Sequence, residues 1–117
     1  MAANEAVEEA FKDGILTAAS LMVGADAAED AVIRANQLHG LGVGLHVVVV
    51  CGRPILPAKE VPDLVDASGM FDTNLVRAGF RYFFLRKVRR QLEREICAQF
   101  DAFQKTGFPL DHVNAHN

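Results

Sequence analysis

The chain lacks the features that mark secreted, membrane-spanning and disulfide-rich proteins. Its two cysteines, Cys51 and Cys97, are far apart and form no CxxC pattern, which favours reduced thiols over a disulfide. The longest apolar run, near residues 43–50, is interrupted by His46 and is far too short to cross a bilayer. The first residues are acidic and show neither the basic start nor the long apolar stretch of a signal peptide. We therefore expect a cytoplasmic protein.

The composition has no strong bias in charge or hydropathy. Half of the 117 residues are hydrophobic and the formal net charge is −3. These values are typical of a soluble globular protein with enough apolar side chains to build a core. A chain of this length predicts one domain at most, here residues 1–117.

The first half of the chain alternates between helical and strand-like patterns. Apolar residues at helical spacing predict a helix over residues 3–12, and a small, apolar run predicts a buried strand over residues 15–23. Asp26 is placed to cap a second helix that extends to about Leu38. The β-branched run at residues 43–50 is the most strand-like segment of the sequence.

The second half begins with a long excursion and ends in a strand. Residues 51–73 hold three of the four prolines, and loops of that length in compact domains are usually functional. A helical region follows over residues 74–105, with a break near Leu85, and residues 112–116 start another strand. Strands that alternate with helices predict an α/β fold with a parallel sheet. Three such strands leave edges uncovered, so we expect an incomplete unit, cut at both ends, whose first strand is missing.

Histidines dominate the candidate chemistry. His46 lies inside an apolar strand, where it is either a hydrogen-bonded core residue or a ligand. His112, Asn114 and His116 alternate and therefore share one face of a strand. His112 and His116 would lie about 13 Å apart, so at most one of them joins His46 at a common site. With Asp111 and Asn114 as nearby oxygen donors, such a site would suit zinc or another divalent ion.

Two other patterns in the sequence have plainer interpretations. Ser20 and Ser68 lack the surroundings of a nucleophile elbow, so a serine hydrolase is not predicted. Seven of the twelve basic residues gather in one helical region, either as a solvated helix face or as a surface that contacts phosphates of nucleic acid or of an anionic membrane. These residues, called the basic cluster below, are Arg77, Arg81, Arg86, Lys87, Arg89, Arg90 and Arg94.

Several segments, taken in order, resemble the YdjC-like carbohydrate deacetylases over essentially the whole chain. They are residues 4–10, residues 13–23, the strand Val43-Gly44-Leu45-His46 and the motif Leu110-Asp111-His112-Val113-Asn114-Ala115-His116. Among the subfamilies, the hopanoid biosynthesis-associated HpnK proteins are the most similar, through residues 52–54, 62–66 and 111–116.

The resemblance implies a partial (β/α) barrel-like fold and a metal-dependent hydrolase that removes N-acetyl groups from amino sugars. By position, His46 and His116 match the two metal-binding histidines of the family, and Asn114 and Arg53 are the implied substrate-binding residues. The metal would be magnesium or zinc. The family's catalytic aspartates would precede Met1, so the resemblance assigns no catalytic residue to this chain, and we expect an incomplete active site with low metal occupancy.

Three functions remain open from the sequence. The first is an incomplete deacetylase whose substrate is an amino sugar or a glycolipid such as a glycosylated hopanoid. The second is a non-catalytic α/β remnant that self-associates as a homodimer through its uncovered strand edges. The third is a module that binds anionic membrane surfaces through the basic cluster, with no nucleic acid expected as a partner.

Overall fold

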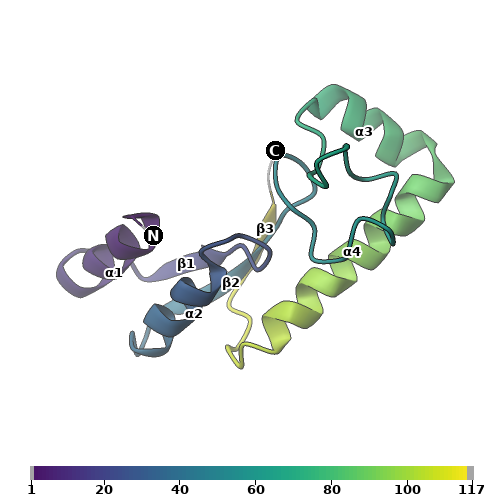
Figure 1. Ribbon diagram of the computed structural model, residues 1–117. Coiled ribbons are helices and arrows are strands. Elements are labelled where there is room, and N and C mark those ends of the chain that lie inside the picture. Colours follow the sequence, from purple (N-terminus) through teal and green to yellow (C-terminus); the bar gives the residue numbers. More distant parts are fainter. Residues whose placement is uncertain (1, 116–117) are drawn as a thin grey trace.

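The computed structural model describes residues 2–115, which form a small parallel sheet with helices packed around it (Figure 1). The sheet has the order β1-β2-β3 and both strand pairs are parallel. The predicted α/β class, with strands and helices in the expected order, is therefore confirmed. In chain order, the elements are α1 (Ala2–Asp13), β1 (Ala18–Leu21), α2 (Ala28–Asn36), β2 (Gly42–Val47), α3 (Leu75–Phe84), α4 (Arg86–Gln104) and β3 (Val113–Ala115).

The two faces of the sheet differ in character because side chains alternate along each strand. On one face, Leu45 is fully buried in an apolar cluster that α2 and α4 cover. The members of that cluster are Leu21, Val43, Leu45, Val47 and Phe103. On the other face lie the alternate residues of the strands, including Ser20 and His46, and Asn114 is paired with His46 in the register. The core face is thus apolar and the open face is polar.

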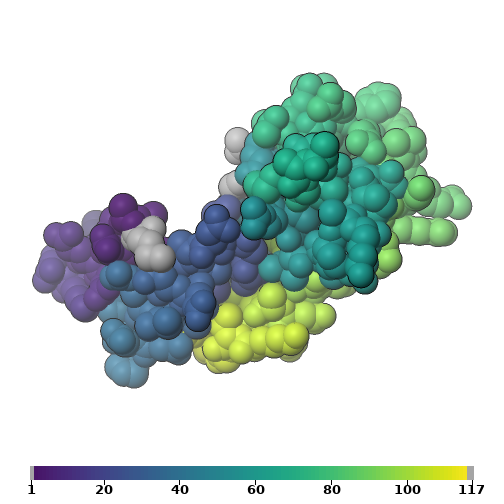
Figure 2. Space-filling view, viewed as in Figure 1, coloured from purple at the N-terminus to yellow at the C-terminus, as the bar shows by residue number. Residues whose placement is uncertain are grey.

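Residues 51–73 form the long excursion that the prolines predict. Apart from one bridge between Val65 and Phe71, the segment contains no regular strand or helix. It is nevertheless well packed, because Val61 and Phe71 are fully buried in a second apolar cluster with Val88 of α4. The excursion is therefore a fixed part of the fold, and it lies beside α3 and α4 at one end of the molecule (Figure 2).

A column of buried polar side chains on α4 holds the backbone beside it. Gln91, Glu95 and Gln99 are spaced four residues apart and so share one face of the helix. Glu95 accepts hydrogen bonds from the backbone N–H groups of Ile55 (2.6 Å) and Leu56 (3.0 Å). Gln99 bonds both backbone groups of Val48, at 2.9 and 2.7 Å. Gln91 accepts from the backbone N–H of Asp63 and donates to the carboxylate of the same residue. These bonds satisfy backbone groups that have no strand partner.

The helical region over residues 74–105 is interrupted at Leu85, as the sequence predicts. Leu85 takes an extended conformation, with φ −100° and ψ 106°, between α3 and α4. Asn74 caps α3 by accepting a hydrogen bond from the backbone N–H of Arg77. The structure describes no helix in residues 2–115 that is both long and apolar enough to cross a membrane.

Two local predictions are wrong. The strand expected over residues 15–23 is only four residues long, and Ile15 is 98% exposed because it lies in the connection from α1 to β1. Asp26 does not cap α2, since the helix begins at Ala28 and its N-cap, Ala27, makes no side-chain cap bond. Asp26 lies instead 3.7 Å from the guanidinium of Arg53.

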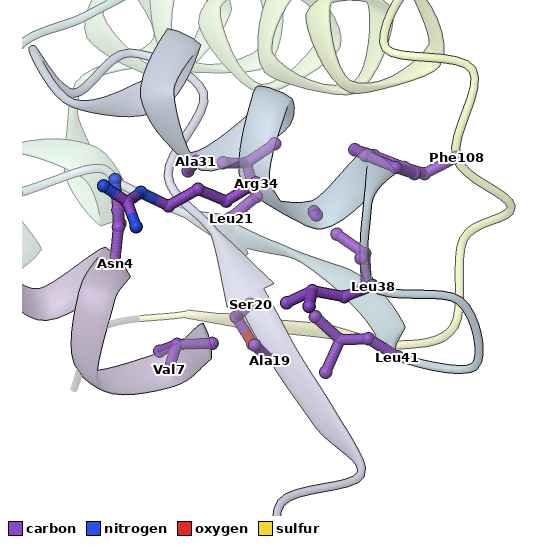
Figure 3. Close-up of a pocket in the computed structure, with 12 residues that line it drawn as sticks. Asn4, Val7, Ala19, Ser20, Leu21, Ala31, Arg34, Leu38, Leu41 and Phe108 are labelled. Atoms are coloured by element: carbon purple, nitrogen blue, oxygen red, sulfur yellow. The ribbon is translucent and has the colours of Figure 1, made fainter. Parts of the chain in front are cut away.

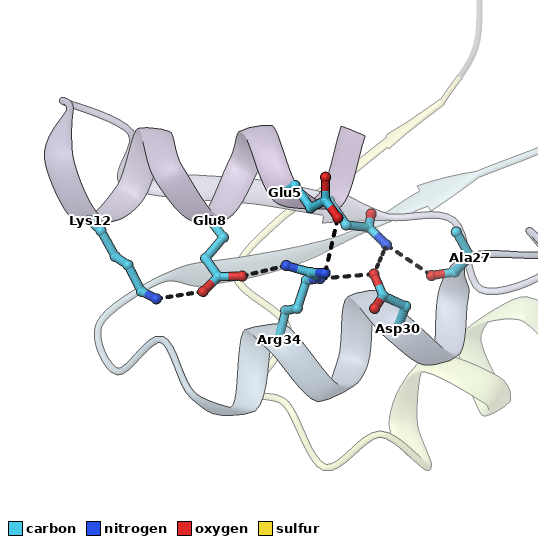
Figure 4. A network of polar contacts seen from close by, with 7 residues as sticks. Glu5, Glu8, Lys12, Ala27, Asp30 and Arg34 are labelled. Carbon is cyan, nitrogen blue, oxygen red and sulfur yellow. Dashed lines mark hydrogen bonds and ion pairs between the residues drawn. The ribbon is translucent and has the colours of Figure 1, made fainter. Parts of the chain in front are cut away.

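Helix α1 is held to α2 by charge and hydrogen bonding, since it has no buried residue. Arg34 of α2 lies at the centre of this contact (Figure 4). Its guanidinium donates to Glu8 at 2.6 Å and to Asp30 at 2.9 Å, while Asn4 donates to Asp30 at 2.8 Å. Hydrogen bonds from Lys12 and Arg34 lower the pKa of Glu8, and the bond from Asn4 is the main cause of the lowered pKa of Asp30.

Candidate functional site

The candidate site begins with a direct contact between two of the predicted residues. His46 on β2 and Asn114 on β3 are aligned in the register of the sheet, so their side chains leave the same face. Nδ1 of His46 lies 2.6 Å from Oδ1 of Asn114. His46 is half-buried and points away from the apolar cluster, so it is not a core histidine. Its role as a metal ligand stays a prediction.

Three further side chains extend this contact across the open face. Nδ2 of Asn114 donates to Oγ of Ser20, at 2.9 Å. Oγ of Ser20 lies 2.8 Å from Nε2 of His112, and Nδ1 of His112 lies 2.8 Å from Oδ2 of Asp111. The five residues from Asp111 to His46 therefore form one continuous chain of hydrogen bonds, called the polar row below.

The topology explains why these residues meet. In a parallel sheet, residues at the same level of neighbouring strands lie side by side. Ser20 on β1 is aligned with Gly44, which has no side chain, so Asn114 on β3 reaches Ser20 across the central strand. As predicted, His112 and Asn114 share one face. His116, the second predicted metal ligand, lies outside the described residues.

Arg53 lies at the carboxyl end of the sheet, where parallel α/β proteins usually bind their ligands. It lines a cavity of about 210 Å³ together with Met22 and Val48, which directly follow β1 and β2. Asp26 lines the same cavity and is the ion-pair partner of Arg53. The structure thus places Arg53 beside a hollow that continues from the strands carrying Ser20 and His46.

A different hollow, of about 70 Å³, lies between α1, β1 and α2 (Figure 3). Its walls are mostly apolar and include Val7, Leu21 and Phe108. Its one charged lining residue, Arg34, is engaged by three acidic side chains of α1 and α2. Ser20 and Asn4 also line this hollow, but Asn4 is bonded to Asp30 and the hydroxyl of Ser20 belongs to the polar row, so we do not assign the hollow a chemical role of its own.

The described residues do not complete a metal site by themselves. Within residues 2–115, no three histidine, cysteine, aspartate or glutamate side chains come close enough together to hold a metal ion. Both cysteines are free thiols, as the sequence predicts, but both are exposed and neither is buried. His46 is therefore the one predicted metal ligand whose surroundings the structure describes.

The basic cluster divides into paired and unpaired residues. Arg77 binds Asp72 through two hydrogen bonds, and Lys87 lies 3.4 Å from Asp63. Arg89 donates to the backbone carbonyls of Tyr82 and Phe83, and Arg94 to that of Glu60. Within residues 2–115, no acidic partner is found for Arg81, Arg86 and Arg90.

The sequence did not predict Ser20 and His112 as partners. The sequence around Ser20 bears only on a nucleophile, and the alternation of His112 and His116 bears only on which of them joins His46 at a metal. Alternation in the strand does place Ser20 opposite Leu21 and so on the open face. The contact with His112 depends on the order of the strands, which no local pattern encodes.

Comparison with known proteins yields a consistent set of relatives. The family described as YdjC-like protein matches residues 1–117. Carbohydrate deacetylases from Geobacillus stearothermophilus and Brevibacillus brevis are 39% and 36% identical to this chain, and each alignment covers 97% of it. A carbohydrate deacetylase from Vibrio cholerae serotype O1 is 32% identical.

A solved structure agrees with these relatives in fold. It is a protein of Enterococcus faecalis V583, provisionally described as a cellobiose-phosphate cleavage protein, with a TM-score of 0.77 and 25% identity. The match covers 97% of this chain and 42% of that chain. The chain likewise spans 43% of the length of the two most similar deacetylases named above.

Proposed function

Because this chain belongs to the YdjC-like protein family, we propose that it forms part of a carbohydrate deacetylase that hydrolyses the C–N bond of N-acetylated amino sugars. Its similarity to carbohydrate deacetylases over 97% of its length supports this activity. The observation that carries the proposal is the contact between His46 and Asn114, because it presents a fixed imidazole on the open face of the sheet.

We assign His46 and His116 to a divalent metal, zinc or magnesium. Metal-ligating histidines usually donate their second ring N–H to an oxygen, and the 2.6 Å contact from Nδ1 of His46 to Asn114 has that form. When bound, the metal supplies Lewis acidity for the acetamide carbonyl and for a hydrolytic water. The carboxylate that takes up a proton belongs, in this proposal, to the part of such a protein that this chain does not span.

Substrate contacts are assigned to two residues. Arg53 lines the cavity at the carboxyl end of β1 and β2, where its guanidinium can donate to sugar hydroxyls. Asn114 lies on the open face next to His46, where the acetamide group of the substrate would approach. The segments that resemble the HpnK proteins support a glycosylated hopanoid as the specific substrate.

Metal titration tests the proposal directly. Zinc and magnesium are titrated by calorimetry into the wild type, into His46→Ala and into His39→Ala. His39 is an exposed histidine just before β2 and outside the polar row, so it is the matched control. Stoichiometric binding that is lost in His46→Ala and kept in His39→Ala supports the site, whereas equal affinity in all three proteins contradicts it. Acetate release from N-acetylglucosamine conjugates then tests the reaction.

A second candidate function follows from the surface of α3. Phe80, Phe83 and Phe84 are 63%, 68% and 61% exposed, and their rings pack on one another with centroids 4.4 and 4.9 Å apart. Exposed aromatic clusters of this kind mark interaction sites. Arg81 lies in the same helix, and Arg86 begins α4 two residues after Phe84. Exposed aromatic side chains on a helix that also carries basic residues suit an anionic lipid surface, to which we assign this face.

Vesicle co-sedimentation tests this second function. The wild type is expected to sediment with phosphatidylglycerol vesicles, to be released by high salt, and to ignore phosphatidylcholine vesicles. The double variant Phe80→Ser/Phe83→Ser should lose binding. Ile15→Ser, which replaces an apolar residue that is even more exposed and lies far from α3 in the sequence, should keep it. Wild-type protein that forms a concentration-dependent dimer and binds no vesicles would replace the membrane assignment with self-association.

A further inference from the structure

When Asp111 is ionised and His112 is neutral, the polar row has only one consistent arrangement of protons, and its direction is set at Asp111. An ionised carboxylate can only accept hydrogen bonds. Nδ1 of His112 lies 2.8 Å from Oδ2 of Asp111, so Nδ1 must carry the proton. A neutral imidazole has one N–H, and Nε2 of His112 is therefore an acceptor.

The same reasoning passes through the next two residues. Since Nε2 of His112 accepts, the hydroxyl of Ser20 must donate to it across their 2.8 Å contact. Because the hydroxyl proton of Ser20 is donated to His112, Oγ of Ser20 can only accept from the amide nitrogen of Asn114, at 2.9 Å. The amide of Asn114 is thereby oriented with its oxygen toward His46, and a flipped amide would place two acceptors against each other at Ser20.

His46 is the fifth of the side chains that define the polar row. Oδ1 of Asn114 is an acceptor, so Nδ1 of His46 must donate to it across 2.6 Å. In the neutral ring, the lone pair then resides on Nε2. We propose that Asp111, His112 and Ser20 are positioning residues that hold His46 in the Nδ1-protonated tautomer, although none of the three is hydrogen-bonded to His46 in the polar row.

The placement of the row favours this function over simple surface hydrogen bonding. Its residues come from β1, β2, β3 and the segment before β3, so the fold must form before the row can assemble. The ring of His112 lies over Gly44, the one residue type that leaves room for it. The consequence for metal binding rests on the function proposed above, because Nε2 would be the ligating atom, but the tautomer itself can be measured without a metal.

The test is a long-range proton–nitrogen NMR correlation of the histidine rings in the whole chain, at about pH 8, above the ordinary histidine pKa. Wild-type His46 is expected as the Nδ1–H tautomer. Asp111→Asn, which lets residue 111 donate, and Ser20→Ala, which frees the amide of Asn114, should each shift His46 toward the Nε2–H tautomer. A His46 tautomer that is unchanged in both variants overturns the proposal.

A rescue variant separates positioning from damage to the fold. Asn114→Asp puts an obligate acceptor directly beside His46, so the double variant Asp111→Asn/Asn114→Asp should regain the Nδ1–H tautomer. Failure of that rescue in a folded protein counts against the mechanism. Zinc affinity is measured in parallel, with an expected loss of about 10- to 100-fold in Asp111→Asn. A shifted tautomer with unchanged zinc affinity upholds the positioning and overturns the metal role of His46.

Discussion

Gly44 lies directly beneath the imidazole of His112, and a Cβ atom built on Gly44 would come within 2.5 Å of both Cε1 and Nε2 of that ring. The same Cβ would lie 2.5 Å from the backbone oxygen of His112, which cannot rotate away as a side chain can. That oxygen accepts the hydrogen bond from the backbone N–H of Leu45 that helps to join β3 to β2. The absence of a side chain at position 44 therefore permits both the strand pairing and the polar row.

Gly44→Ala is expected to destabilise the protein and to disrupt the polar row. Overpacking of this kind usually costs about 1–3 kcal/mol, and the fixed backbone oxygen places this site toward the upper end. Gly79→Ala is the matched control, because a Cβ at Gly79 meets nothing within 4 Å. Gly79 lies in α3, where alanine should stabilise the helix by about 0.5–1 kcal/mol. Urea denaturation measures both effects, and a Gly44→Ala protein as stable as the wild type would refute this account.

Glu95→Ala is expected to loosen the excursion over residues 51–73. Glu95 is 0% exposed and accepts from two backbone N–H groups, those of Ile55 and Leu56. Its loss leaves both donors without this acceptor, at a cost of about 1 kcal/mol for each because the two bonds are only partly buried. Hydrogen exchange at residues 55 and 56 should accelerate, and the free energy of unfolding should fall by about 2 kcal/mol. Glu93→Ala, an exposed change on the same helix, should alter neither quantity.

The order of the elements could be predicted because it depends on local patterns. Apolar periodicity and the β-branched run located the helices and β2, and the break at Leu85 was found from the sequence. The column on α4 was missed for a physical reason. Polar residues at helical spacing normally face water, and only the neighbouring excursion, with its unpaired backbone N–H groups, makes burial of Glu95 favourable.

The candidate site could be predicted in part. His46 and Asn114 were selected as site residues, and the structure brings them into contact. Ser20, Gly44 and His112 acquire their roles from the register between strands that are distant in the sequence. Register is set by the packing of the whole sheet, so no pattern within one segment could have revealed the polar row.

Arg34→Ala is expected to detach α1 from α2. Helix α1 has no buried residue, and Arg34 is the cation that joins its acidic side chains to Asp30. Hydrogen exchange over residues 2–13 should approach that of an unprotected peptide, while exchange in β2 stays unchanged. Arg53→Ala is the control, since its ion pair with Asp26 is longer, at 3.7 Å, and lies away from α1. Undiminished protection of α1 in Arg34→Ala would show that other contacts hold this helix.

Titration of Tyr82 is expected to lower the stability of the folded protein at high pH. Its hydroxyl donates to the backbone oxygen of Val49 at 2.5 Å, and burial, aided by the charge of Asp72, raises the pKa of Tyr82 from 10.0 to about 12. Because the pKa in the folded state is the higher one, the contribution of Tyr82 to stability is complete below pH 10 and is lost as the pH rises toward 12.

The measurement is direct because the chain has one tyrosine and no tryptophan. Ultraviolet absorbance of the folded protein should titrate with a midpoint near 12, and that of the urea-unfolded protein near 10. Tyr82→Phe should lower stability at neutral pH by about 1 kcal/mol, through the lost hydrogen bond. Lysines and arginines also titrate in base, but they do so in both proteins, so the difference between wild type and Tyr82→Phe isolates the phenol. The difference in stability between the two proteins should shrink between pH 10 and 12. If the absorbance of the folded wild type instead titrates with a midpoint near 10, Tyr82 is open to solvent and does not anchor α3 to the end of β2.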